Sequence, residues 1–122
     1  MRYSTDGSNF TFITTADGAE GEYNWLVPND AVTTTAFIKI SDTSDASVNN
    51  TSSQFSIIPK FVITKPAFGD KYIANRVLDT QRIQWERYGG VDKVHLFYSK
   101  TDFSEGILNS TPIEFNVTNN GD

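Results

Sequence analysis

Val91-Asp92-Lys93-Val94-His95-Leu96-Phe97-Tyr98 carries the clearest alternation of side chains in this chain. Val94, Leu96 and Tyr98 fall on one face of an extended segment, because successive side chains of a strand point to opposite sides. Gly89-Gly90 comes just before it, and glycine pairs are typical of turns. This period of two predicts a β-strand with one buried face.

Short apolar segments of the same kind recur along the chain, separated by Gly, Asp, Asn and Pro. We expect strands at 10–13, 23–27, 35–40, 54–58, 61–64 and 113–117, and the stretch 76–85 is expected to hold another strand, centred on Ile83 and Trp85. The polar stretch 41–53 is predicted to be a loop, and Asp6-Gly7 and Asp17-Gly18 are predicted to be hairpin turns. No segment holds a helical period for three turns, and a parallel sheet would need helical crossovers. The sequence therefore predicts an all-β, antiparallel protein.

Composition narrows the class further. The chain has 122 residues, of which 38% are hydrophobic and 13% aromatic, which suffices for one sandwich-sized core. Its net charge of −5 disfavours binding to nucleic acid or to an anionic membrane. Cysteine is absent, so disulfides and thiol chemistry are excluded. No apolar run approaches the roughly 18 residues of a membrane span, so we expect no direct membrane insertion.

The residues that follow several asparagines bear on the cellular compartment of the protein. Five asparagines begin an Asn-x-Ser/Thr triplet without proline in the middle, and they are Asn9, Asn49, Asn50, Asn109 and Asn116. These glycosylation candidates favour an extracellular or cell-surface protein. A polar β-protein surface rich in Thr and Asn would produce the same triplets.

The order of segments resembles a known architecture. Residues 61–66, 83–85 and 90–99 resemble the first half of immunoglobulin-like (Ig-like) or fibronectin-III-like β-sandwich repeats of large extracellular or cell-surface proteins. The segments 3–7, 23–28, 36–42 and 55–57 resemble the second half of such a repeat. The pattern is also similar to Ser/Thr-rich GPI-anchored repeat domains of cell-wall glycoproteins. This resemblance implies an antiparallel Ig-like β-sandwich in which a Trp of an early strand is buried.

The two halves stand in reversed order, and an internal match supports this reading. Tyr3-Ser4 matches Tyr98-Ser99, and Phe12 matches Phe115, with an insertion in the later copy. We therefore expect residues 1–58 to form the C-terminal half of one repeat, 59–60 a linker, and 61–122 the N-terminal half of the next. Each half would expose an unpaired strand edge and an uncovered face.

Closure of the two halves on each other is disfavoured by their joint. Only Pro59 and Lys60 separate the two apolar segments, too few to run back along a sandwich. Two accounts remain: a piece of a longer tandem array, or a subunit in which chains complete one another by strand complementation. In either case the partners are other copies of this chain or neighbouring Ig-like repeats.

Residues that could carry chemistry are few. His95 is the only histidine and has no recognisable nucleophile motif around it, so we expect no enzyme, no catalytic residues and no cofactor. Asp42 and Asp45 could offer oxygen ligands to calcium, with Asn49 and Asn50 behind them. A polar turn rich in Asp and Asn explains the same residues.

Aromatic and aliphatic residues are assigned to the core or to assembly. This set comprises Trp25, Trp85, Phe37, Ile38, Val94 and Leu96. The function that follows is a structural subunit or spacer of an Ig-like array. An alternative is a carbohydrate-binding accessory module with glycan ligands, in which the tryptophans would stack on sugar rings. Exposed aromatics on one sheet would favour the module, and burial of both tryptophans would count against it.

Overall fold

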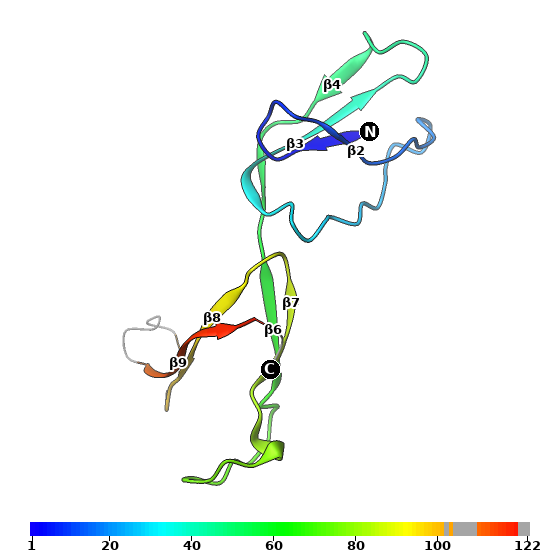
Figure 1. The fold of residues 1–122 in the computed structure, drawn as a ribbon. Coiled ribbons are helices and arrows are strands. Elements are labelled where there is room, and N and C mark those ends of the chain that lie inside the picture. The colour runs from blue at the N-terminus through cyan, green and yellow to red at the C-terminus, as the bar shows by residue number, and fades with distance from the viewer. Residues whose placement is uncertain (102, 104–109, 120–122) are drawn as a thin grey trace. The chain divides into compact units, whose positions relative to one another are not determined.

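The computed structural model describes residues 1–101, 103 and 110–119, and the chain forms two compact units, Met1–Pro59 and Lys60–Asp122 (Figure 1). Every strand pair in both units is antiparallel, and the described residues contain no helix beyond one 3-10 turn, η1 (Asp79–Gln81). The predicted all-β antiparallel class is confirmed. The Ig-like sandwich and the assignment of 1–58 and 61–122 as half-repeats stay predictions.

A single sheet forms the first unit. Its strands are β1 (Arg2–Ser4), β2 (Thr11–Phe12), β3 (Thr33–Ser41), β4 (Asn49–Thr51) and β5 (Phe55–Ile57). The order is β2-β1-β3-β4, and β5 pairs with the earlier part of β3. The nine-residue β3 thus lies at the centre of the sheet, as its Thr- and Ile-rich sequence favours.

The turn between β1 and β2 is held by polar side chains. The Ser4 hydroxyl accepts the backbone N–H of Gly7 at 2.9 Å and donates to Asp6 at 2.9 Å. Gly7 has a φ of +78°, which glycine adopts without steric cost. The predicted Asp6-Gly7 hairpin turn is therefore confirmed.

Two hairpins make up the second unit. β6 (Lys60–Lys65) pairs with β7 (Gln84–Tyr88), and β8 (Lys93–Tyr98) pairs with β9 (Thr111–Thr118). Among the described residues each pair is a separate two-stranded sheet. A two-stranded hairpin is at best marginally stable alone in water, so contacts between these hairpins matter.

Several expected elements differ from the structure. Residues 23–27 form no strand, because no neighbouring strand offers its backbone groups to them and Pro28 lacks an N–H. Asp17-Gly18 joins no two strands, so its prediction as a hairpin turn is wrong. The predicted loop 41–53 contains β4, which pairs with the last residues of β3.

The stretch 76–85 was expected to hold a strand centred on Ile83 and Trp85, and the strand found there, β7, contains Trp85 but begins only at Gln84. The residues before it are irregular apart from η1. The Gln81 side chain accepts the N–H of Ile73 at 2.6 Å and donates to the carbonyl oxygens of Ile73 and Arg76. These local bonds satisfy backbone groups that a strand would have paired with a neighbour. Hydrogen bonds from the Gln81 side chain therefore take the place of strand pairing in this segment.

Candidate assembly surfaces

Few apolar side chains are buried. Among the described residues only Ala31, Ala36 and Trp85 are buried hydrophobic residues. The exposed large hydrophobic residues of the first unit include Phe12, Leu26, Val27, Val32, Ile40, Val48, Phe55 and Ile58. Those of the second include Phe61, Val62, Ile63, Phe68, Ile73, Val77, Tyr88, Tyr98, Ile113 and Phe115. Apolar surface is thus exposed on a larger scale than folded monomers usually present.

The total surface can be compared with that of folded proteins. The chain exposes 9692 Å². Two separate folded domains, each of half its 13.6 kDa mass, would together expose about 7,900 Å². The excess is about 1,800 Å², and each partner of a standard interface buries about 800 Å². The uncovered surface is thus large enough for about two interfaces.

In the first unit one face of the sheet carries a row of apolar residues, and Phe12 and Phe37 lie on the other face. Ala36, Ile38 and Ile40 share a face of β3, and Tyr3 lies directly opposite Ile38 on β1. The ring of Trp25 packs on Tyr3 with centroids 5.0 Å apart. The irregular segment 13–32 therefore covers this face only in part, and Ile40 stays 57% exposed.

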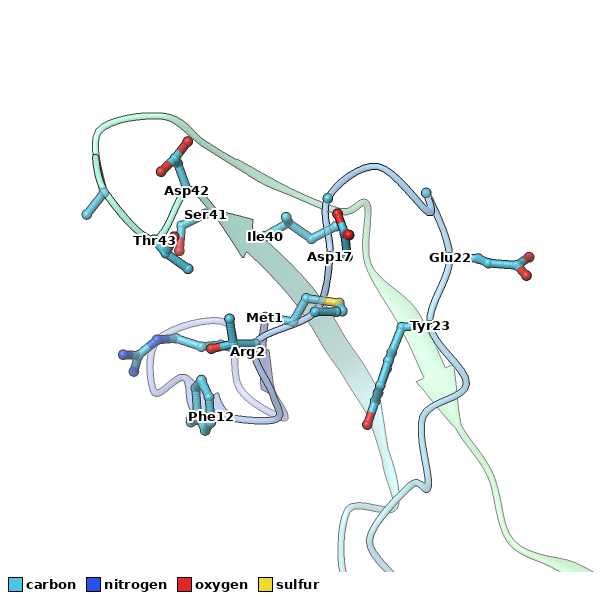
Figure 2. A pocket seen from close by; sticks show the side chains of 15 residues that line it. Met1, Arg2, Phe12, Asp17, Glu22, Tyr23, Ile40, Ser41, Asp42 and Thr43 are labelled. Atoms are coloured by element: carbon cyan, nitrogen blue, oxygen red, sulfur yellow. The ribbon is translucent and has the colours of Figure 1, made fainter.

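Next to Ile40 the same unit has a hollow of about 610 Å³. It is lined by the irregular segment at Ala16, Asp17 and Tyr23, and by the sheet side at Met1 and Ile40 (Figure 2). Apolar and acidic side chains mix on its walls. Its volume suits a few inserted side chains as well as a small molecule.

In the second unit Asn119 joins the two hairpins. Trp85 of β7 donates its Nε1–H to the Oδ1 of Asn119 at 2.6 Å, and Arg87 donates to the Asn119 carbonyl oxygen. The Asn119 backbone N–H donates to Asp92 at 2.8 Å, and its side-chain amide donates to Val91. Asn119 is fully buried, so its polar groups are all satisfied inside the protein. The sequence analysis gave this residue no role, although Asn119 follows the predicted strand 113–117 after one intervening residue.

On β8 and β9 an aromatic cluster surrounds His95. The Phe115 ring packs edge-on against His95 and Phe97, with centroids 5.3 Å and 5.9 Å away. His95 Nδ1 accepts the backbone N–H of Asn116 at 3.1 Å. This imidazole therefore has a structural contact in the hairpin, and the structure gives it no nucleophile partner among the described residues.

The residues assigned to core or assembly have mixed positions. Trp85 is buried, whereas Trp25, Phe37, Ile38, Val94 and Leu96 are half-buried. Both tryptophans have a ring or hydrogen-bond partner within their own unit. Neither offers a fully exposed ring face.

Asp42 and Asp45 serve the loop that carries them. Asp42 Oδ1 accepts the backbone N–H groups of Ser44 and Asp45, at 2.6 Å and 3.2 Å. Asp45 Oδ1 accepts both the N–H and the hydroxyl of Ser47, and these bonds lower the pKa of Asp45. No group of three or more potential metal ligands occurs in the part of the chain that the structure describes. The carboxylates are explained by turn formation.

The glycosylation candidates differ in the hydrogen bonds that their side-chain amides make. Asn9 donates its Nδ2 to Asp6, and Asn49 donates its own to the carbonyl oxygens of Ala46 and Ser47. Asn50 uses its Oδ1 to accept the N–H of Thr51. All three are exposed, as is Asn116, whereas Asn109 lies outside the described residues.

Comparisons with known proteins give no relative. No family model, no curated protein and no solved structure matches this chain. Within the described residues, no helix is long and apolar enough to cross a bilayer.

Proposed function

We propose that this chain is a structural subunit or spacer of an extracellular or cell-surface Ig-like array, and that its copies join head to tail. Each unit carries an incomplete β-core, and strands from another copy complete it. The partners are therefore other copies of the chain or repeats of the same kind. The chain performs no reaction, and its ligand is protein.

One observation carries this proposal: the exposed surface of 9692 Å², which exceeds that of two folded domains of half the mass by about 1,800 Å². Large apolar side chains account for much of it in both units. Head-to-tail contacts bury two different surfaces of each subunit, which requires two interfaces per chain. The excess matches the area of about two standard interfaces.

The mass in solution tests the proposal. Light scattering at increasing protein concentration should give a mass that rises above the 13.6 kDa of one chain. Ile40→Lys should lower that mass at each concentration, because it places a charge on the uncovered sheet face. Val48→Lys is a matched control, since Val48 is 60% exposed in the same hairpin but lies in its loop. A folded monomer at every concentration would exclude the proposal.

The extracellular location is a separate part of the proposal. It rests on exposed Asn-x-Ser/Thr triplets at Asn9, Asn49, Asn50 and Asn116. Secretion from a glycosylating host, followed by intact mass before and after removal of N-linked glycans, tests it. A mass shift on glycan removal supports acceptor sites, and an unchanged mass contradicts them.

A carbohydrate-binding module is less well supported. Stacking on sugars needs an accessible aromatic face. Trp85 is 7% exposed, and Trp25 packs on Tyr3. The aromatic surface that stays open is spread over phenylalanines and tyrosines on several strands, which suits protein contact better.

A further inference from the structure

We propose that β8 of one copy pairs with β3 of a second copy, in the place that β1 holds within its own unit. This inference rests on the proposed function, because it names the strands and the register through which copies join. The partner is a second copy of this chain, and the contact is a strand exchange in which β8 takes the place of β1 beside β3.

β1 and β8 are equivalent strands by sequence and by pairing. The same two residues, Tyr-Ser, stand at the end of each: Tyr3-Ser4 closes β1, and Tyr98 is the last residue of β8 and is followed by Ser99. Tyr3 pairs with Thr11 of β2, and Tyr98 pairs with Thr111 of β9. When Tyr3 and Tyr98 are aligned, this pairing aligns Thr11 with Thr111. Phe12 then corresponds to Pro112, because Phe12 lies opposite Arg2 and Pro112 lies opposite Phe97. The expected match of Phe12 with Phe115 is therefore wrong.

The two strands differ in their neighbours. β1 lies between β2 and β3, whereas β8 pairs only with β9 among the described residues. One edge of β8 therefore presents backbone groups with no strand beside them, and such an edge is a template for another strand. In the first unit the corresponding edge is taken by β3.

If β8 pairs with β3 in the register that β1 has, the apolar faces of β8 and β3 lie on the same side of the sheet. Tyr3 lies opposite Ile38 in that register, so Tyr98 would lie opposite Ile38 and Leu96 opposite Ile40. Val94, Leu96 and Tyr98 would then extend the apolar face of β3. A slip by one residue would place Leu96 opposite Lys39 or Ser41, so continuity of the apolar face favours this register.

The pairing within the first unit contains a repulsive contact that exchange removes. Arg2 lies directly opposite Lys39, and like charges at opposed positions destabilise a strand pair. Phe97 would take the place of Arg2 after exchange. An aromatic ring beside Lys39 is favourable, and the Lys39 ammonium already lies 5.8 Å from the ring centroid of Phe10.

Strand length favours the exchange as well. β1 has three residues and pairs with only the stretch Phe37–Lys39 of β3, whereas β8 has six residues. The longer strand can pair with Ile40 and Ser41 too, so more backbone bonds form than are lost.

Disulfide trapping between full-length chains tests the register. The chain has no cysteine, so Ile40→Cys and Leu96→Cys each introduce a single thiol. An isotope-labelled Ile40→Cys chain is mixed with unlabelled Leu96→Cys chain, oxidised mildly and weighed intact. Ser41→Cys replaces Ile40→Cys as control, since its side chain points to the other face of β3. The heterodisulfide should be at least about tenfold more abundant than with the control, because a disulfide needs facing Cβ atoms.

Each outcome separates this inference from the proposed function. Equal yields with the Ile40 and Ser41 variants, in chains whose scattering mass still exceeds one copy, would overturn the register and leave the assembly standing. A predominant Leu96–Leu96 disulfide would overturn it in favour of β8–β8 pairing. A scattering mass of one copy at every concentration would remove both proposals.

Arg2→Glu provides a second variant that leaves the cysteine positions intact. It turns the Arg2–Lys39 contact into an opposite-charge pair and so stabilises β1 in its own unit. The yield of the Ile40–Leu96 heterodisulfide should fall several-fold. An unchanged or higher yield would mean that β1 is not the strand displaced.

Discussion

Trp85 and Asn119 join the two hairpins of the second unit through one buried hydrogen bond, from the indole Nε1 to the amide Oδ1 at 2.6 Å. Trp85 comes from β7, and Asn119 directly follows β9. Trp85 and Asn119 are the buried residues of this unit within the described part of the chain. The contact between the hairpins is therefore concentrated at this point.

Asn119→Ala should lower the free energy of unfolding by about 1–3 kcal/mol, because it leaves the buried Trp85 N–H without an acceptor. Urea unfolding followed by tryptophan fluorescence at fixed protein concentration measures the loss. Thr118→Ala is the control, since Thr118 is the exposed neighbour of Asn119 at the end of β9. Equal losses for both variants would contradict a special role for Asn119.

Trp85→Ala should lower the stability of the assembled chain by about 3–5 kcal/mol, because it removes a buried ring and leaves a cavity. Trp85→Phe keeps much of the packing and removes the N–H donor, so its loss should be smaller. Calorimetry at one protein concentration compares the two variants with Trp25→Ala, in which the lost ring is half-buried. A mutant as stable as the parent in assembly would remove this claim.

Gly7→Ala should destabilise the first unit by about 1–2 kcal/mol, because the left-handed conformation is costly for a residue with a Cβ. The added Cβ would also lie 3.1 Å from Cε2 of Phe37. Gly18→Ala is matched to it, since its Cβ would meet nothing within 4 Å. Thermal unfolding should separate the two variants, and identical midpoints would argue against strain at Gly7.

The carboxylate of Asp6 should make the β1–β2 turn sensitive to acid. The backbone N–H and then the side-chain amide of Asn9, followed by the Ser8 N–H and the Ser4 hydroxyl, hold the pKa of Asp6 well below its usual value. A lowered pKa in the folded state gives stability that is present above the ordinary carboxyl pKa and is lost as pH falls toward the lowered one.

Asp6→Asn should therefore unfold more easily than the parent at neutral pH, and the difference should shrink below about pH 4. Thermal midpoints across this range measure it. Asp30→Asn removes another exposed carboxylate of the same unit and should not reproduce the pattern. A difference that is constant with pH would contradict the linkage.

The strands with the clearest alternation could be predicted from sequence, and those around Phe37 and Leu96 lie where they were expected. The segments at 23–27 and 76–83 could not, because a strand needs a neighbour to pair with and the sequence does not reveal whether one is present. β1 was missed as a separate strand because three residues are too few to display a period.

The candidate surfaces were anticipated only in outline. Exposed apolar residues and an uncovered sheet face follow from the expectation of incomplete cores. The position of Asn119 between two hairpins does not, since Trp85 and Asn119 are far apart in sequence and become partners only through folding. The opposition of Arg2 and Lys39 likewise depends on the register of β1 on β3.

The sequence by itself determined the secondary-structure class, because the alternation of side chains is a local property of an extended backbone. It also determined which residues are apolar and which chemistries are excluded by the lack of cysteine. Only the tertiary structure decided which strands have two neighbours, which edge of β8 lies open, and how Trp85 is buried. Those features depend on hydrogen bonds and packing between segments that are distant in the chain, which no local pattern encodes.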